Sequence, residues 1–215
     1  MKGVFEIMQK WKTDKSLYDC KRVNNVKQLN YTEYVNEFMS QDPLRDWESI
    51  ERCIKLWDFF KSKVDMTGIE HVLDAGTKDG QMVDYLNRSG YKAEGIEIDQ
   101  QYVHYAKSKL RQVSYGNICD MVNLEDGEYD VVFSHHVLGL CPSYPDAYRE
   151  MLRVTRSGGY VVTCNDSPGN FRKHFYMINS DDEVRNILSN CPEHDIIYFG
   201  HHSNDKELVV ILRKK

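Results

Sequence analysis

Residues 72–80 read VLDAGTKDG, an apolar run that leads into a turn with two glycines. The apolar run predicts a buried strand at 71–76, and the glycines predict a tight turn into a helix that ends at about Arg88. Gly76 and Gly80 let the backbone approach a ligand closely and let the helix pack tightly on the sheet. We therefore expect a strand–turn–helix unit that opens an α/β sheet.

The alternation of strands and helices continues to the last residues. Six more strands are expected at 93–98, 113–117, 129–134, 160–164, 195–199 and 207–212, and helices at 100–110, 144–155 and 181–190. The residues between the last two strands, 200–206, are too few for a crossover helix, so this pair should form an antiparallel hairpin. The sequence predicts an α/β fold: a doubly wound, mostly parallel seven-stranded sheet with a C-terminal antiparallel hairpin.

The first 69 residues have a different pattern, which is typical of helices. Apolar side chains recur at helical spacing from Ile50 to Val64, so residues 46–63 should form an amphipathic helix that packs in the core. Thr32 can cap a short helix that runs through Phe38. We divide the chain into a helical N-terminal cap or extension at 1–69 and an α/β domain at 70–215.

The composition excludes several classes of protein. The 215 residues carry a net charge of −5, which argues against a generally basic nucleic-acid coat. The longest apolar runs are far below the roughly 20 residues that a membrane helix needs. The first 15 residues show no signal peptide, and the six cysteines form no C-x-x-C pair. We expect a cytoplasmic protein with reduced thiols and with neither a nucleic-acid nor a membrane partner.

Three polar features fall at the carboxyl edge of the predicted sheet, where open parallel sheets bind ligands. The first is the turn at 74–80, in which Asp74 would repel a pyrophosphate but suits a cationic ligand. The second is Glu97, which can accept both hydrogen bonds of a ribose diol. The third is the segment 116–118 (Gly-Asn-Ile), which can flank an aromatic base. Lys78 replaces the middle glycine of the dinucleotide fingerprint, so that fingerprint is not met.

Four segments in order resemble the successive motifs of class I S-adenosylmethionine-dependent methyltransferases. They are VLDAGTKDG at 72–80, GIEID at 95–99, YDVVFSHHVL at 129–138 and EMLRVTRSGG at 150–159. The resemblance covers residues 70–165 closely, and its final hairpin fits 190–215. It implies that 70–215 is a Rossmann-like methyltransferase domain with S-adenosylmethionine as cofactor.

The resemblance also implies which residues hold the cofactor. The turn after the first strand would surround its carboxypropyl and amino groups, and the acid after the second strand would hold the ribose hydroxyls. Side chains after the third strand would flank adenine, and Ser134 would lie beside the reactive methyl. The implied cofactor-binding residues are Asp74, Gly76, Thr77, Gly80, Glu97, Ile98, Asn117, Ile118 and Ser134.

His135 and His136 are the candidate catalytic residues, because histidine titrates near neutrality and the fourth strand ends at the cofactor edge. We favour His135, because side chains at a strand end alternate. Some relatives hold magnesium with acidic residues after the fourth and fifth strands. Ser134 takes the first of these places here, so we assign no metal ligands. His201 and His202 are interpreted as surface residues, since adjacent histidines usually point apart.

The leading interpretation is a methyltransferase that acts on an oxygen or nitrogen of a small-molecule acceptor, or of a peripheral glycan or peptide group. The N-terminal helices and the stretch 165–180, which includes Asn165, Asp166 and several aromatic residues, would build the acceptor pocket. A catalytically silent methyltransferase-fold scaffold is the main alternative, because Lys78 stands where the family usually has a third glycine and because fold does not determine function. An NAD-linked oxidoreductase is a third, although the fingerprint is missing.

Overall fold

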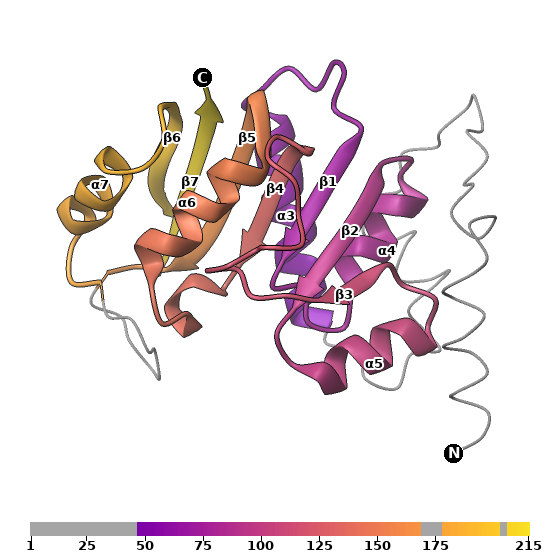
Figure 1. The fold of residues 1–215 in the computed structure, drawn as a ribbon. Coiled ribbons are helices and arrows are strands. Elements are labelled where there is room, and N and C mark those ends of the chain that lie inside the picture. Colours follow the sequence, from indigo (N-terminus) through magenta and orange to yellow (C-terminus); the bar gives the residue numbers. More distant parts are fainter. Residues whose placement is uncertain (1–46, 169–177, 203–205) are drawn as a thin grey trace.

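Seven strands form one sheet in the order β3-β2-β1-β4-β5-β7-β6 (Figure 1). The computed structural model describes residues 47–168, 178–202 and 206–215. The strands are β1 (His71–Ala75), β2 (Lys92–Glu97), β3 (Val113–Tyr115), β4 (Tyr129–His135), β5 (Thr155–Asp166), β6 (His194–His202) and β7 (Glu207–Lys214). All neighbouring pairs are parallel except β5–β7 and β6–β7, which are antiparallel. The predicted sheet and its terminal hairpin are confirmed.

Helices cover both faces of the sheet (Figure 1). They are α3 (Trp47–Lys61), α4 (Gln81–Arg88), α5 (Gln100–Ser108), α6 (Tyr144–Val154) and α7 (Asp181–Ser189), with a short 3-10 helix at Leu138–Leu140. The apolar sides of α3, α4 and α5 share one core with the sheet, and those of α6 and α7 share the other. No helix in the described ranges is long and apolar enough to cross a membrane.

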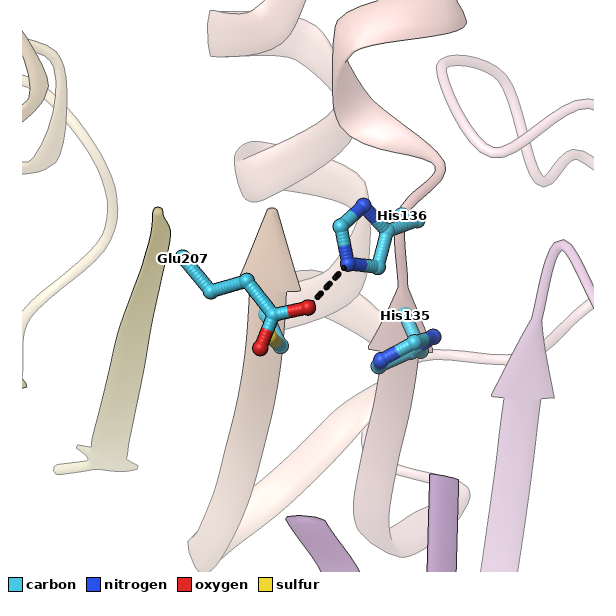
Figure 2. A group of neighbouring side chains, drawn as sticks. His135, His136 and Glu207 are labelled. Carbon is cyan, nitrogen blue, oxygen red and sulfur yellow. Dashed lines mark hydrogen bonds and ion pairs between the residues drawn. The ribbon is translucent and has the colours of Figure 1, made fainter. Parts of the chain in front are cut away.

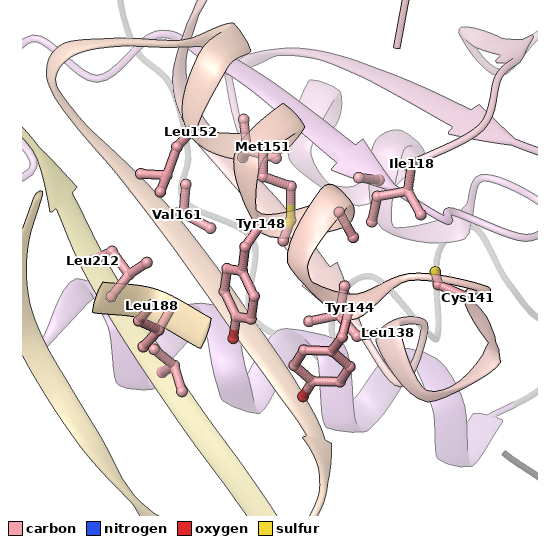
Figure 3. Close-up of a cluster of buried hydrophobic side chains, with 14 of the residues drawn as sticks. Ile118, Leu138, Cys141, Tyr144, Tyr148, Met151, Leu152, Val161, Leu188 and Leu212 are labelled. Carbon is pink, nitrogen blue, oxygen red and sulfur yellow. The ribbon is translucent and has the colours of Figure 1, made fainter. Parts of the chain in front are cut away.

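The aromatic stripe predicted for residues 46–63 lies in the first core. Ile54, Trp57 and Phe60 are buried on α3, and the Trp57 ring meets the Phe133 ring edge-on from the sheet. On the opposite face, Tyr148 of α6 packs among apolar side chains of the sheet and α7 (Figure 3). Each helix therefore buries the side that its 3.6-residue period predicts.

Part of the predicted N-terminal extension lies outside the described residues, including the short helix expected from Thr32 to Phe38. Within the described part, α3 packs in the same core as α4 and the sheet. The division of the chain at residue 69 stays a prediction.

The sequence Ser157-Gly158-Gly159 predicts a turn ahead of the fifth strand, but this strand begins at Thr155, five residues before its predicted start at Tyr160, and the glycines lie inside it. Tyr129 pairs with Thr155 and Val131 with Tyr160, so a bulge takes up the extra residues of β5. A Cβ atom at Gly159 would lie 2.7 Å from the carbonyl oxygen of Asp130, which explains why this position lacks a side chain. The expected turn is thus an irregular continuation of the strand.

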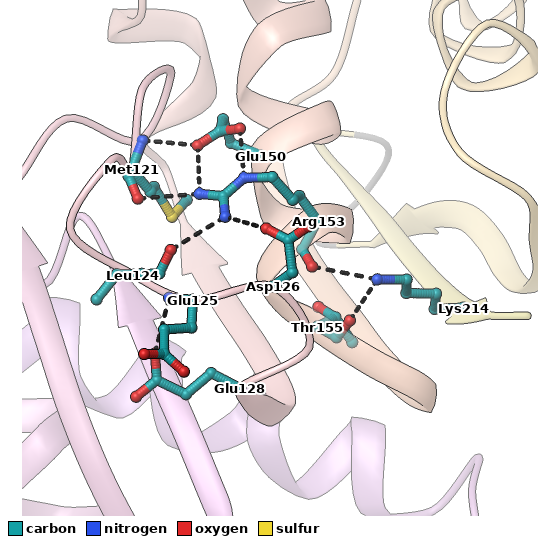
Figure 4. A network of polar contacts seen from close by, with 9 residues as sticks. All are labelled: Met121, Leu124, Glu125, Asp126, Glu128, Glu150, Arg153, Thr155 and Lys214. Atoms are coloured by element: carbon teal, nitrogen blue, oxygen red, sulfur yellow. Dashed lines mark hydrogen bonds and ion pairs between the residues drawn. The ribbon is translucent and has the colours of Figure 1, made fainter.

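Arg153 of α6 anchors the segment that follows β3 (Figure 4). Its guanidinium donates hydrogen bonds to the carbonyl oxygens of Met121 and Leu124 and to the carboxylates of Glu150 and Asp126. Met121 and Leu124, whose carbonyl oxygens accept these hydrogen bonds, lie in a segment without regular secondary structure. The network therefore positions the chain between β3 and β4, where the predicted adenine-binding residues lie.

Candidate active site

The sheet reverses its winding between β1 and β4, and a cavity of about 390 Å³ lies at their carboxyl ends. This is the place at which open α/β sheets bind ligands, and the volume falls within the range of small-molecule sites. Nine of the eleven residues predicted from the sequence line the cavity. They are Asp74, Gly76, Thr77, Glu97, Ile98, Asn117, Ile118, His135 and His136.

Gly76 lets the loop after β1 approach the loop after β4. Its φ angle is +85°, a left-handed conformation that favours glycine. A Cβ atom at this position would lie 2.4 Å from Cγ2 of Val137, far inside van der Waals contact. The glycine is thus required both by the backbone conformation and by the close contact with the next loop.

Lys78 occupies a position that demands the same left-handed conformation, with φ at 56°. Its backbone amide donates a 2.8 Å hydrogen bond to Oε2 of Glu97, and the amide of Asp99 donates to Oε1 at 2.9 Å. The Lys78 ammonium lies 5.8 Å from the centre of the Tyr102 ring. The loop therefore keeps its turn although a lysine replaces the third glycine, and the hydrogen bond to Glu97 ties it to β2.

Acidic groups dominate the polar lining near β1. Asp74 is only 4% exposed, and burial raises its pKa to about 7, with the nearby carboxylates of Glu97 and Asp79 adding to the rise. Asp79 has a cationic partner, because Nη1 of Arg111 lies 3.5 Å from its Oδ2. A positively charged ligand group beside Asp74 would stabilise the ionised carboxylate. The electrostatics of this end of the cavity thus favour a cation.

Two of the predicted cofactor-binding residues do not line the cavity. Ser134 is buried and its hydroxyl donates a hydrogen bond to the carbonyl oxygen of Ala75 at 2.9 Å. Gly80 stands at the N-terminus of α4, where a Cβ atom would lie 2.7 Å from Cγ2 of Val113. Both residues contribute to the packing around the cavity without lining it.

Two residues of the predicted acceptor pocket, Asn165 and Asp166, are also absent from the lining. Asn165 is buried, and its Oδ1 accepts a hydrogen bond from the Leu138 amide. The aromatic residues predicted for that pocket, from Phe171 to Tyr176, lie outside the described residues.

The two candidate catalytic histidines lie together at the end of β4. Burial, together with the nearby His136 and Arg52, lowers the pKa of His135 to about 3. This pKa lies well below the near-neutral value of an ordinary histidine. His136 has a left-handed backbone with φ at 55°, and its Nε2 lies 3.0 Å from Oε1 of Glu207 (Figure 2).

The residues of α3 that line the cavity were not predicted from the sequence. Ile50, Arg52 and Cys53 line it, as do Tyr102 and the residues at 140–142. Ile50 and Cys53 belong to the apolar stripe that we interpreted as core only. They reach the cavity because α3 begins beyond the edge of the sheet, and the helical period carries no signal for that.

His201 and His202 were interpreted as surface residues, but both are half-buried and have partners. Nε2 of His201 lies 2.9 Å from Oδ2 of Asp181, and Nε2 of His202 lies 3.0 Å from the Tyr198 hydroxyl. The two rings therefore bind different neighbours on β6 and α7 and do not converge on one point.

Comparison with known proteins agrees with this geometry. Residues 73–163 match the family model for a methyltransferase domain. The sequence is similar to a methyltransferase domain over these residues, which make up less than half of the chain. A malonyl-[acyl-carrier protein] O-methyltransferase from Pectobacterium atrosepticum is 29% identical to it over 93 residues, which are 42% of this chain and 36% of that protein. The chain spans about a third to a half of the length of the curated relatives that it matches.

Solved structures share the fold of the methyltransferase domain at low identity. An S-adenosylmethionine-dependent methyltransferase from Mesorhizobium loti is 12% identical, with a TM-score of 0.61 over 74% of this chain and 97% of that one. The [4+2]-cyclase SpnF is 15% identical, with a TM-score of 0.64 over 81% of this chain and 85% of that one. Both likenesses concern the fold alone.

Proposed function

We propose that the protein is an S-adenosylmethionine-dependent methyltransferase that acts on an oxygen or nitrogen of a small-molecule acceptor, or of a peripheral glycan or peptide group. One observation carries the proposal: Asp74 and Glu97 present carboxylates to a single cavity at the switch point of the sheet. The burial of Asp74 makes an unpartnered negative charge costly there, so the site favours a ligand that brings a positive charge.

The residues present fit S-adenosylmethionine. Asp74 would receive its ammonium group, and both oxygens of Glu97 keep a lone pair for the ribose diol beyond the amides that they already bind. Ile98 and Ile118 border the same cavity and offer apolar contacts for adenine. When bound, S-adenosylmethionine supplies a methyl group on a positively charged sulfur, which is already activated for transfer.

The protein's own contribution at the acceptor end is orientation and proton removal. Holding a nucleophile in line can supply several kcal/mol of the barrier. We assign His135 and His136 to this end, where Arg52 and Cys53 of α3 complete the lining. If the acceptor loses a proton, the His136 ring can take it, and the Glu207 carboxylate at 3.0 Å would stabilise the resulting positive charge.

A silent scaffold is the alternative, because fold does not determine function: SpnF shares the fold and is named for cyclisation, not for methyl transfer. Lys78 does not favour it, because the loop keeps its left-handed turn and its hydrogen bond to Glu97. The oxidoreductase interpretation finds little support, since the buried Asp74 would repel a pyrophosphate.

Calorimetric titration with S-adenosylmethionine and with NAD, on wild type and on two variants, tests the proposal. Asp74→Asn should weaken S-adenosylmethionine binding at least tenfold. Asp84→Asn is the matched control, because Asp84 pairs with Arg88 on α4 and does not line the cavity. Binding of NAD alone, or equal binding by both variants, would overturn the cofactor assignment. Tight cofactor binding without turnover over a broad panel of oxygen and nitrogen acceptors would favour the scaffold.

A further inference from the structure

Four side chains that can each bind a metal ion converge beside the acceptor end of the cavity. They are His135, His136, Cys164 and Glu207, called the histidine–cysteine–glutamate cluster below. One ligand atom from each lies within 4.8 Å of the ligand atoms of the other three. Figure 2 shows the His136 ring directed at the Glu207 carboxylate and the His135 ring beside it.

Strand alternation places three of the four on the same face of the sheet. Residues two apart on a strand share a face, and Phe133 and Val162 belong to the core beneath α3. His135 and Cys164 therefore follow them on that face, and these two residues pair directly across β4 and β5. Glu207 begins β7 at the same edge.

His136 joins the cluster only because its backbone is unusual. On a regular strand it would point to the face opposite His135. Its left-handed φ of 55° turns the side chain back, and the centres of the two rings lie 4.5 Å apart. A non-glycine residue in this conformation costs free energy, and such outliers cluster at functional sites.

The surroundings of His136 match those of a metal-binding histidine. Its Nε2 faces Glu207 Oε1 at 3.0 Å, and its Nδ1 faces Asp166 Oδ1 at 3.7 Å. Ligating histidines commonly direct the second ring nitrogen toward a carboxylate, which orients the ring. Asp166 pairs with Glu207 across β5 and β7, so the strands hold ligand and orienting group side by side.

One cation competes for the cluster. Nη1 of Arg52 lies 3.8 Å from Oε1 of Glu207, and half of the Arg52 side chain is exposed. Its position at the start of α3 lets the guanidinium swing into solvent. A divalent ion bound to the cluster would therefore displace Arg52 from Glu207.

We propose that His135, His136, Cys164 and Glu207 bind one divalent transition-metal ion of the zinc type. Nitrogen, sulfur and carboxylate ligands suit Zn²⁺, whose tetrahedral bonds of about 2.0–2.3 Å separate the ligand atoms by roughly 3.3–3.8 Å. The ligand atoms here lie within 4.8 Å of one another, so the widest separations need to close by about 1 Å to reach the tetrahedral range. On binding, the Cys164 thiol loses its proton to solvent, and no oxidation or reduction takes place.

Metal binding can be measured without cofactor or acceptor, so the first test of the metal site does not depend on the proposed methyl transfer. His135 and His136 also line the cavity, so the ion would border the acceptor. Four protein ligands leave a tetrahedral ion no open position for an acceptor oxygen, so we assign the ion no proton-transfer step.

Cobalt(II) titration of chelator-treated, full-length protein tests the proposal, because Co²⁺ reports its ligands by absorption. Wild type should bind one equivalent with a thiolate-to-cobalt charge-transfer band and the visible bands of a tetrahedral ion. Cys164→Ser should lose the charge-transfer band. Glu207→Gln and His136→Asn should weaken binding by more than about tenfold, the lower limit found even for outer-shell partners. Asparagine tolerates the left-handed backbone at position 136.

Variants at a histidine and a cysteine outside the cluster test whether cobalt binds elsewhere on the protein. His201→Gln and Cys191→Ser should bind cobalt as wild type does, and Arg52→Gln should bind it more tightly because the competing cation is gone. A far-ultraviolet circular dichroism spectrum like that of wild type verifies that each variant is folded. The metal-site proposal is overturned if wild type binds no equivalent of cobalt. It is also overturned if Cys164→Ser and Glu207→Gln bind cobalt with an unchanged spectrum and affinity. Neither outcome depends on whether the methyltransferase assignment is right.

Discussion

The backbone amide of Lys78 donates a 2.8 Å hydrogen bond to Oε2 of Glu97, which joins the loop after β1 to the end of β2. The second oxygen of Glu97 accepts from the Asp99 amide at the start of α5. One carboxylate thus holds two loops that border the cavity. The oxygens of Glu97 can each accept a further hydrogen bond from a ligand in the cavity, so one side chain has both a structural and a ligand-binding role.

Glu97→Gln is expected to weaken S-adenosylmethionine binding by about 1–3 kcal/mol, because a neutral amide replaces charge-assisted acceptors. Isothermal calorimetry measures the change. Glu94→Gln on the same strand is the control, because Glu94 binds His71 and does not line the cavity. An unchanged affinity of the Glu97 variant would remove this residue from the cofactor site.

Asp74 should make the ligand-free protein less stable as the pH rises. Its pKa is about 7 in the folded state and 3.8 without burial, so the folded protein holds the proton between these values. Stability is therefore lost as pH rises from about 4 to about 7, by at most roughly 4 kcal/mol at 1.36 kcal/mol per pKa unit. Urea unfolding at pH 5 and pH 8 should show this drop in wild type and a smaller one in Asp74→Asn. Equal drops would mean that other groups cause it.

Lys78→Gly should stabilise the protein by up to about 1 kcal/mol, because glycine adopts a φ of 56° without steric cost. It should also strengthen cofactor binding, since it removes a positive charge from a cavity that favours a cation. Leu110 supplies the matched control: it has a φ of 60°, is 69% exposed and lies away from the cavity. Leu110→Gly should change the thermal midpoint similarly but leave cofactor affinity unaltered. A loss of affinity in Lys78→Gly would show that the ammonium group takes part in binding.

Arg153→Ala should destabilise the fold by about 1–3 kcal/mol, because two backbone carbonyls and two carboxylates lose their donor. Chemical denaturation measures the effect. Arg149→Ala on the same helix should cost little, since the ion pair between Arg149 and Asp146 is exposed. Comparable losses in the two variants would show that the Arg153 network does not anchor the segment after β3.

The sequence predicted those parts of the site whose signals are local. Gly76 and Glu97 follow predicted strands at short distances along the chain, so periodicity and glycine chemistry were sufficient to place them at one edge. Ser134 was misplaced because side chains alternate along a strand, and only one of two successive residues at its end can face the cavity. The burial that lowers the pKa of His135 comes from tertiary packing, and no local sequence pattern records it.

The contact between His136 and Glu207 could not be predicted from the sequence. The two residues are 71 positions apart, and they meet because β7 pairs with β5. The expected hairpin gave no indication of which of its strands would join the sheet. No sequence pattern indicates the left-handed backbone at His136 either, because this conformation is uncommon for residues other than glycine.

The insertion of β7 between β5 and β6 also has a consequence for biosynthesis. β7 leaves the ribosome after the other six strands of this sheet, yet it fills an interior place between β5 and β6. Until about residue 214 has emerged, the edge of β5 has no partner and the apolar faces beside it are open. The nascent chain therefore presents an unpaired strand edge until β7 emerges, the kind of surface that templates aggregation. Ligands made from β4, β5 and β7 can assemble only after that step.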